Sequence, residues 1–229
     1  WLLRQINRLV TLYGLALALL LLIRQLGEHH APIGWFNSVA HLFWLSALVL
    51  VPVCLLCRQH RAALALTPAL LVFLVSYTPF FLPNAPAPLD KPTLSLLTFN
   101  VTAKSTDPET VTAIIREADA DIVALQELST EIAEQLRDLY PYHALNPQAE
   151  RFSMGMGVLS RYPLVSQEYW QINRAHQRVT FYFEGQLMTL YNTRPLYPFD
   201  SWDGFEAHQS EVKTVLERAT AETSPVILM

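Results

Sequence analysis

Acidic residues are almost missing from the first third of this 229-residue chain. Glu28 is the single carboxylate before residue 90, where five arginines make the net charge +4, whereas the remaining 11 basic and 19 acidic residues give −8. Cysteine is scarce as well: Cys54 and Cys57 are the only two, so the chain after them uses no disulfides. Such an asymmetry of charge indicates two regions that lie in different solvents.

These shortages exclude some classes of protein. An acidic region is a poor general nucleic-acid binder, because non-specific binding depends on Lys and Arg that neutralise phosphates. A zinc site is not predicted either, because Cys54-x-x-Cys57 has neither a second Cys pair nor a nearby His pair. Both thiols end an apolar run, which favours two cysteines packed in a membrane helix.

Hydrophobic residues take the place of charge in the first region. Three runs without a charged residue follow one another, at residues 9–23, 35–57 and 62–82. The second and third are long enough for a hydrocarbon core about 30 Å thick, and the flanking Arg8 and Arg24 extend the first by snorkelling. A cleavable signal peptide would have a single apolar run. Residues 1–83 are therefore predicted to form a three-helix transmembrane anchor.

Arginines in the short loops predict the orientation of this anchor. Arg4, Arg8, Arg58 and Arg61 share one side of the membrane, and Arg24 and Lys91 lie on the other. The excess of positive charge marks the cytoplasmic side. We therefore expect a multi-pass protein of the inner (cytoplasmic) membrane, with its N-terminus inside and everything after residue 84 outside the cytoplasm.

The second region is predicted to be a separate α/β domain over residues 93–229. Four prolines within residues 83–92 predict an extended spacer, which places a linker at 84–92. Beyond it, apolar strands alternate with amphipathic helices, and Glu184-Gly185 is typical of a hairpin turn. Trp1 stands where a Met is usual and Met229 ends within an apolar run, so we expect both ends of the chain to be cut.

Polar side chains follow three of the predicted strands. Asn100, Glu127 and Arg194 each come at or just after the end of an apolar segment, where α/β sheets usually build their sites. Mg²⁺ prefers oxygen ligands such as a carboxylate and a neutral oxygen, which Glu127 and Asn100 offer. From the pattern alone, each residue is equally well a solvated side chain at a strand end.

Four segments in this order resemble the endonuclease/exonuclease/phosphatase superfamily, the DNase I-like fold. They are Leu97-Thr98-Phe99-Asn100-Val101, Asp121-Ile122-Val123-Ala124-Leu125-Gln126-Glu127, Gly157-Val158-Leu159-Ser160-Arg161-Tyr162-Pro163 and Leu190-Tyr191-Asn192-Thr193-Arg194-Pro195. The resemblance covers about residues 93 to 229 and implies an incomplete four-layer α/β sandwich. It also implies Mg²⁺ or Mn²⁺ held by Glu127 and Asn100, with Arg194 and Tyr191 as catalytic residues.

The sequence departs from this family in two respects. Arg194 stands where the family has its active-site His, so no imidazole acid is present there, although a guanidinium can bind a phosphate oxygen. The alternative is a surface arginine with a solvated partner. The family's Gly-Asp-x-Asn turn and late Asp-His pair do not occur up to Met229, so we expect residues 1–229 by themselves to be inactive.

The resemblance implies a divalent-metal-dependent phosphoester hydrolase, and the apolar runs and loop arginines predict that it is membrane-anchored and acts outside the cytoplasm. Three spans before such a domain also resemble the membrane-bound branch associated with teicoplanin and vancomycin resistance. That likeness suggests a lipid-linked phosphate or pyrophosphate as substrate. Two alternatives stay open: an endonuclease of the same superfamily, and a non-catalytic membrane module with a degenerate site. The acidic charge makes a nucleic acid the less favoured partner.

Overall fold

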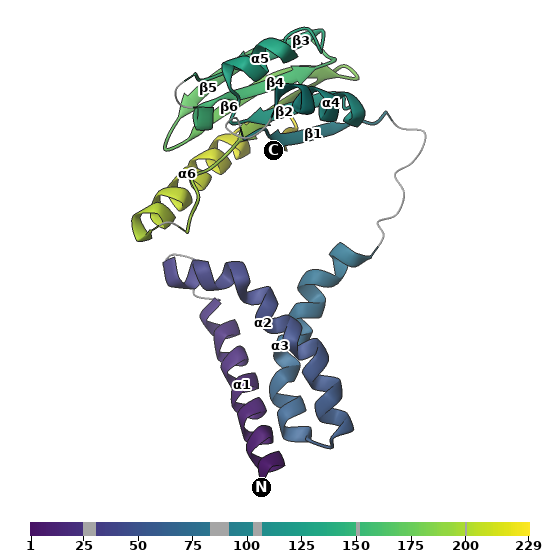
Figure 1. The fold of residues 1–229 in the computed structure, drawn as a ribbon, viewed down its shortest axis with the longest axis vertical. Coiled ribbons are helices and arrows are strands. Elements are labelled where there is room, and N and C mark those ends of the chain that lie inside the picture. The colour runs from purple at the N-terminus through teal and green to yellow at the C-terminus, as the bar shows by residue number, and fades with distance from the viewer. Residues whose placement is uncertain (25–30, 83–91, 103–106, 150–151, 200) are drawn as a thin grey trace. The chain divides into compact units, whose positions relative to one another are not determined.

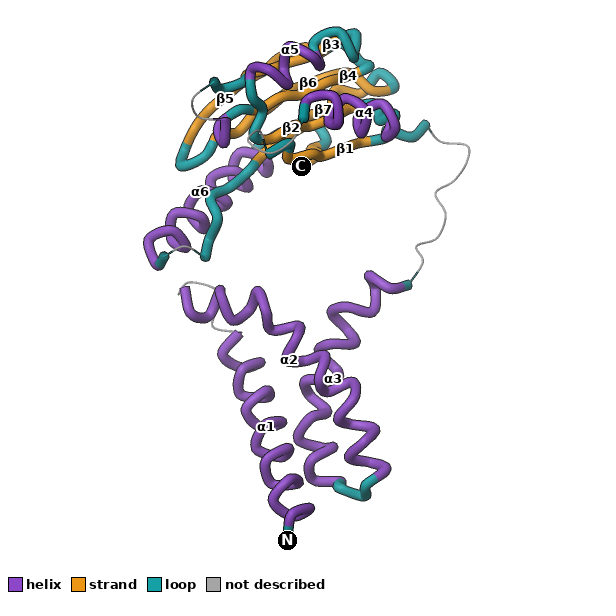
Figure 2. The backbone as a smooth tube through the Cα atoms, viewed as in Figure 1, coloured by secondary structure: helices purple, strands orange, loops and turns teal. Residues whose placement is uncertain are grey.

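The structure, a computed structural model, describes residues 1–24, 31–82, 92–102, 107–149, 152–199 and 201–229. The chain divides into two compact units, Trp1–Pro88 and Leu89–Met229 (Figures 1 and 2). The predicted linker at 84–92 lies outside the described residues apart from Pro92.

Three helices form the N-terminal unit, as predicted, and each is long and apolar enough to cross a membrane. They are α1 (Leu2–Arg24), α2 (Ala31–Leu56) and α3 (His60–Phe81). The first is longer than the apolar run, because the sequence before Leu9 contains no helix breaker and the helix continues back through Arg4 and Arg8. Its 23 residues are sufficient for a complete span.

Small residues let these helices approach closely. Alanines such as Ala40, Ala47 and Ala62 are fully buried in the cluster that the three helices share. Gly14 lies against α3, where an added Cβ would come within 2.8 Å of the carbonyl carbon of Ala65. Large apolar side chains instead cover the outer surface of the unit, as expected for helices that face lipid.

The C-terminal unit contains two four-stranded sheets and three α-helices among its described residues. Sheet A has the order β1-β2-β4-β3 and sheet B the order β5-β6-β7-β8. Strands β1 and β2 are parallel, as are β7 and β8, and the other pairs are antiparallel. The bounds are β1 (Leu96–Asn100), α4 (Pro108–Ala118), β2 (Ile122–Gln126), α5 (Thr130–Leu136), β3 (Tyr142–Asn146), a 3₁₀ turn (Phe152–Met154), β4 (Met156–Ser160), β5 (Leu164–Gln171), β6 (Ala175–Phe183), β7 (Gln186–Thr193), α6 (Trp202–Thr220) and β8 (Val226–Leu228).

Local sequence signals explain several of these boundaries. Asp107 caps α4 by accepting a hydrogen bond from the backbone N–H of Thr110, and Pro108 takes the first helical position. Glu184 and Gly185 both adopt positive φ, at 49° and 77°, as the two-residue turn between β6 and β7 requires. β3 carries no such signal, because its half-polar sequence becomes a strand only by pairing with β4.

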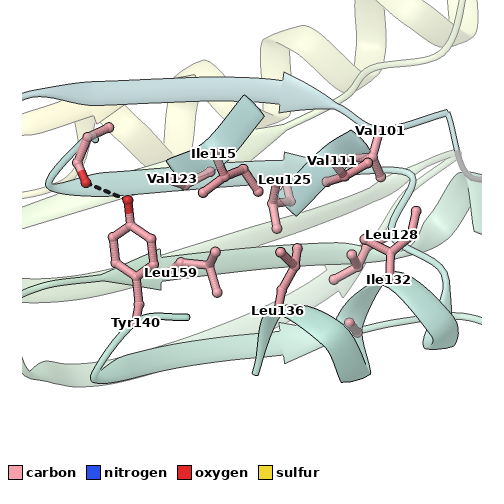
Figure 3. Close-up of a cluster of buried hydrophobic side chains, with 12 residues drawn as sticks. Val101, Val111, Ile115, Val123, Leu125, Leu128, Ile132, Leu136, Tyr140 and Leu159 are labelled. Carbon is pink, nitrogen blue, oxygen red and sulfur yellow. Dashed lines mark hydrogen bonds between the residues drawn. The ribbon is translucent and has the colours of Figure 1, made fainter. Parts of the chain in front are cut away.

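Two hydrophobic layers hold the unit together. One lies between sheet A and the helices α4 and α5, where Ile115, Leu125 and Leu136 are fully buried and the Tyr140 hydroxyl donates to the Ala120 carbonyl at 2.6 Å (Figure 3). The other lies between the two sheets and includes Val158 and Phe181. Helix α6 covers the outer face of sheet B (Figure 1). The order helices, sheet, sheet, helix confirms the predicted four-layer α/β arrangement.

Candidate active site

Asn100 and Glu127 lie side by side where two parallel strands end. Asn100 is the last residue of β1 and pairs in register with Gln126, the last residue of β2, so Glu127 follows immediately beside it. The Asn100 Nδ2 donates a hydrogen bond to Glu127 Oε1 at 2.9 Å, and its Oδ1 accepts one from the backbone N–H of Thr102 at 3.0 Å. The amide is thereby fixed with one end on the carboxylate.

The backbone around Glu127 is strained and firmly held. Glu127 has a φ of +58°, in the left-handed region that costs a non-glycine residue about 1 kcal/mol. On its far side, the Leu128 N–H donates to the Gly155 carbonyl at 3.1 Å. A Cβ at Gly155 would lie 1.9 Å from the Leu128 carbonyl oxygen, so only glycine permits this approach. Left-handed strain of this kind is typical of functional positions.

Arg194 completes the cluster from the other sheet. It follows β7, and its Nη2 pairs with Glu127 Oε1 at 2.5 Å. The two side chains are 29% and 13% exposed, so the pair is largely shielded from water. The Arg194 Nη1 is buried and has no hydrogen-bond acceptor among the described residues. One half of the guanidinium is thus paired, and the other half is enclosed by the protein.

A buried carboxamide network places Arg194 opposite Glu127. Asn192 is fully buried; its Oδ1 accepts from Gln126 Nε2 at 2.6 Å, and its Nδ2 donates to the carbonyls of Leu125 and Gly157, each at 3.0 Å. These bonds tie β7 to β2 and β4 across the sheets. Sequence reasoning assigned no role to Gln126 or Asn192. The signal that could have found them is a carboxamide inside an apolar strand: Gln126 lies one residue before Glu127, and Asn192 lies two residues before Arg194.

Tyr191 is not brought to this cluster. Successive residues of a strand point to opposite faces, so Tyr191 faces away from the side on which Asn192 reaches sheet A. Its hydroxyl donates to Glu222 Oε1 at 2.8 Å, and burial raises the pKa of the phenol. Arg178 also pairs with Glu222, and the hydrogen bond from Arg178 is the main reason that the pKa of that carboxyl is lowered.

A buried carboxylate on α6 fixes the loop that leaves β7. Glu211 is fully buried and accepts hydrogen bonds from the backbone N–H groups of Leu196 and Arg174, each at 2.7 Å. It also pairs with His176 Nε2 at 2.9 Å. Desolvation is the main cause that lowers the pKa of His176, so at neutral pH this contact is a hydrogen bond to a neutral imidazole. Glu211 was not a sequence candidate, because its role depends on contacts far along the chain.

The donor set at this edge fits a single hard cation. No cluster of three or more His, Cys, Asp or Glu residues occurs within the described ranges. Mg²⁺, however, is commonly held by one or two carboxylates together with water and substrate phosphate. Glu127 supplies the carboxylate, and the guanidinium against Oε1 shows that the pocket accommodates positive charge. Asn100 would offer its oxygen to the same ion after its amide turns over, because its Nδ2 faces Glu127 and its Oδ1 accepts from the Thr102 N–H in this structure.

Comparison with known proteins agrees with this arrangement. The sequence profile described as "Endonuclease/Exonuclease/phosphatase family" matches residues 97–221, which include every residue of the cluster. The chain belongs to this family. Its members hydrolyse phosphoesters, and they typically use divalent metals. Among curated proteins, no match is found.

Solved structures of the endonuclease/exonuclease/phosphatase fold resemble the chain at low identity. A family protein from Leptotrichia buccalis C-1013-b is 18% identical with a TM-score of 0.46, over 60% of this chain and 65% of that one. A humanized D. rerio TDP2 is 17% identical with a TM-score of 0.48, over 59% and 63%. Sphingomyelinase C from Streptomyces griseocarneus is 19% identical with a TM-score of 0.43, over 60% and 63%. The chain thus spans a little under two thirds of these structures.

Proposed function

We propose that this chain is the membrane-anchored part of a divalent-metal-dependent phosphoester hydrolase that acts outside the cytoplasm on a lipid-linked phosphate or pyrophosphate. The observation that carries the proposal is the convergence of Glu127, Asn100 and Arg194 at one edge of the two sheets. A carboxylate, a carboxamide and a half-paired guanidinium form a site suited to a cation and a phosphate together.

Each residue has a distinct part in the proposed reaction. Glu127 and Asn100 would hold Mg²⁺ or Mn²⁺, which when bound supplies Lewis-acid stabilisation of phosphoryl charge. Arg194 would give a charge-assisted hydrogen bond to a phosphate oxygen by turning its guanidinium from the position it has in the structure, where Nη1 is enclosed and Nη2 pairs with Glu127. Asn192 keeps Arg194 opposite Glu127. Tyr191 supports sheet B through Glu222 and does not contact substrate in this scheme.

The membrane unit supports a lipid as the substrate. Three helices can each cross a bilayer, and a tethered site meets membrane lipids at high effective concentration. The distribution of loop arginines favours the orientation in which the N-terminus is inside. Fusing alkaline phosphatase after Pro92 tests this orientation: we expect activity in intact cells, and a stably expressed but inactive fusion would refute it.

Hydrolysis assays separate the substrate classes. The protein, with any residues that follow Met229 in its gene, is incubated with Mg²⁺ and either a polyprenyl pyrophosphate or DNA. We expect release of phosphate from the lipid, lost in Glu127→Gln and kept in Glu131→Gln, which changes an exposed carboxylate in the first turn of α5. Cleavage of DNA alone would favour an endonuclease, and inertness toward both would remove the hydrolase proposal.

One observation favours a second candidate, a non-catalytic membrane module. Arg194 already neutralises Glu127, as expected of a site that has exchanged a metal for an internal cation. Titration with Mn²⁺ distinguishes the two: a hydrolase binds the ion through Glu127, whereas a degenerate site does not bind it at all.

A further inference from the structure

Exposed aromatic side chains gather on the segment that leaves the candidate active site. Among the described side chains of the C-terminal unit, five Phe, Tyr or Trp residues are exposed, and three of them lie within residues 197–202. These three are Tyr197, Phe199 and Trp202, and they are called the aromatic tip below. They follow Arg194 closely along the chain, between the end of β7 and the first turn of α6.

The segment that carries the aromatic tip is fixed against α6. The Leu196 N–H donates to Glu211 Oε2 at 2.7 Å, and the Leu196 carbonyl accepts from His208 Nδ1 at 2.5 Å. Two prolines in the same segment restrict its backbone further. Figure 2 shows the loop after β7 running beside α6 toward the first turn of the helix, at the end away from the strands. The tip therefore has an ordered support, which lowers the entropy lost when it binds a partner.

The side chains of the aromatic tip do not pack into the unit. Tyr197 and Trp202 are 59% and 56% exposed, and Phe199 is 41% exposed. The rings of Tyr197 and Phe199 contact each other edge to face, with their centroids 5.2 Å apart. Phe205, one turn along α6 from Trp202, is buried instead and supplies the aromatic ring that the core needs. Exposed Trp and Tyr rings of this kind are typical of residues at a membrane–water interface.

The charges around the aromatic tip favour a neutral surface as its partner. Residues 195–206 contain three acidic residues and no Lys or Arg, and the chain from residue 90 onward carries a net charge of −8. Attraction to anionic lipids or to nucleic acid requires clustered Lys and Arg. The tip is therefore suited to the interfacial layer of a bilayer with zwitterionic headgroups, where burial of aromatic surface supplies the attraction.

A bilayer is within reach of this surface. Helix α3 is long and apolar enough to cross a membrane, and the nine residues of the linker at 84–92 span at most about 30 Å when fully extended. Such a tether gives the C-terminal unit a high effective concentration at the lipid surface. Even a weak interfacial contact is then populated.

We propose that the aromatic tip docks on the surface of a lipid bilayer and holds the edge that carries Glu127 and Arg194 at the level of the headgroups. The inference rests on the proposed membrane function and adds how the site meets its substrate. Tyr197 is three residues from Arg194, so the tip and the site lie at the same end of β7. A phosphate on a lipid then reaches Glu127 without leaving the bilayer.

Fluorescent probes at two tyrosines test the docking. The protein, with any residues that follow Met229 in its gene, carries Cys54→Ala and Cys57→Ala and is placed at one copy per phosphatidylcholine nanodisc. The dye NBD is attached at Tyr197→Cys or at Tyr182→Cys, a similarly exposed tyrosine beside the turn at the opposite ends of the strands. Interfacial residues lie about 5–10 Å into the headgroup region, so nitroxide-labelled lipid should remove about half or more of the emission at 197. Emission at 182 should be unchanged.

Two further measurements test the chemistry of the contact. Phe199→Ser should lower the quenched fraction at 197 severalfold, because it removes apolar surface from the interface, whereas Tyr182→Ser should leave it unchanged. Near-ultraviolet circular dichroism reports whether each variant is folded, and the comparison of the two dye positions stands without Phe199→Ser. With anionic lipid in the discs, quenching at 197 should rise with added salt, because salt screens repulsion from the acidic unit.

Three outcomes would overturn the proposal. Equal quenching at Tyr197→Cys and Tyr182→Cys would show that no face is preferred, and a blue-shifted dye at 197 that nitroxide lipid does not quench would show that protein covers the tip. Quenching that falls with salt would show an electrostatic attachment instead of an aromatic one. No hydrolysis enters these measurements. Quenching at 197 in a protein inert toward both lipid pyrophosphate and DNA keeps the docking and removes the hydrolase, whereas lipid hydrolysis without quenching does the reverse.

Discussion

Replacing Arg194 by Met should strengthen divalent-metal binding at Glu127. The guanidinium lies 2.5 Å from Glu127 Oε1 and therefore competes with any cation for that carboxylate. Among the described residues, removing it leaves Glu127 with the hydrogen bond from Asn100 on the same oxygen. The carboxylate then carries an uncompensated charge in a site that is largely shielded from water, which is the condition that favours a metal ion.

The magnitude follows from the geometry. Two unit charges about 4 Å apart attract by about 4 kcal/mol at an effective dielectric constant of about 20. Partial exposure of both side chains reduces the net value toward the range of about 1.5 to 3 kcal/mol that is usual for hydrogen bonds to charged groups. Because about 1.4 kcal/mol is a factor of ten, Kd for Mn²⁺ should fall roughly 10- to 100-fold.

Electron paramagnetic resonance of free Mn²⁺ measures this affinity directly. Arg161→Met is the matched control, because Arg161 also pairs with carboxylates, Asp119 and Asp121, but at the opposite ends of the strands. We expect the control to keep the wild-type Kd and Glu127→Gln to abolish binding. An unchanged or weaker affinity in Arg194→Met would refute the competition between the guanidinium and the metal.

Three further predictions concern the groups that support the site, each measured by thermal unfolding of the chain in detergent with near-ultraviolet circular dichroism. Gly155→Ala should destabilise the C-terminal unit by about 2 kcal/mol or more, because the new Cβ meets the Leu128 carbonyl. Gly185→Ala should cost only about 1 kcal/mol, because its Cβ meets nothing and the cost comes from the positive φ alone. Equal losses of stability in the two variants would contradict this difference. Asn192→Ala should cost about 3 kcal/mol or more, because Gln126 and two strand carbonyls lose their partner, and a loss below about 1 kcal/mol would be inconsistent with that network. Glu222→Gln should make stability less dependent on pH on the acid side. The hydrogen bond from Arg178 lowers the pKa of Glu222, so the carboxylate stabilises the fold above its unfolded-state pKa, and this contribution is lost as pH falls through the folded-state pKa. Identical slopes of stability against pH for the variant and the wild type between about pH 5 and 3 would exclude this contribution.

Much of the fold is written locally in the sequence. The apolar runs predicted the three long helices, because length and hydrophobicity alone decide whether a segment can cross a bilayer. Asp107 with Pro108 marked the start of α4, and Glu184-Gly185 marked the hairpin turn, because both signals act within a few residues. The sequence could also have excluded Tyr191 from the site. It is an odd number of residues from Arg194, and the alternation of side chains along a strand therefore places the two on opposite faces.

What the sequence alone determined is therefore the membrane helices, most strands and the identity of Glu127, Asn100 and Arg194 as candidates, since each depends on near neighbours in the chain. Only the tertiary structure decided that Arg194 pairs with Glu127, that Asn192 joins the two sheets and that Glu211 holds Arg174 beside the loop after β7. These contacts join residues 15 to 67 positions apart. No periodicity or local propensity encodes such distances, because they are set by how two sheets and a helix pack as layers.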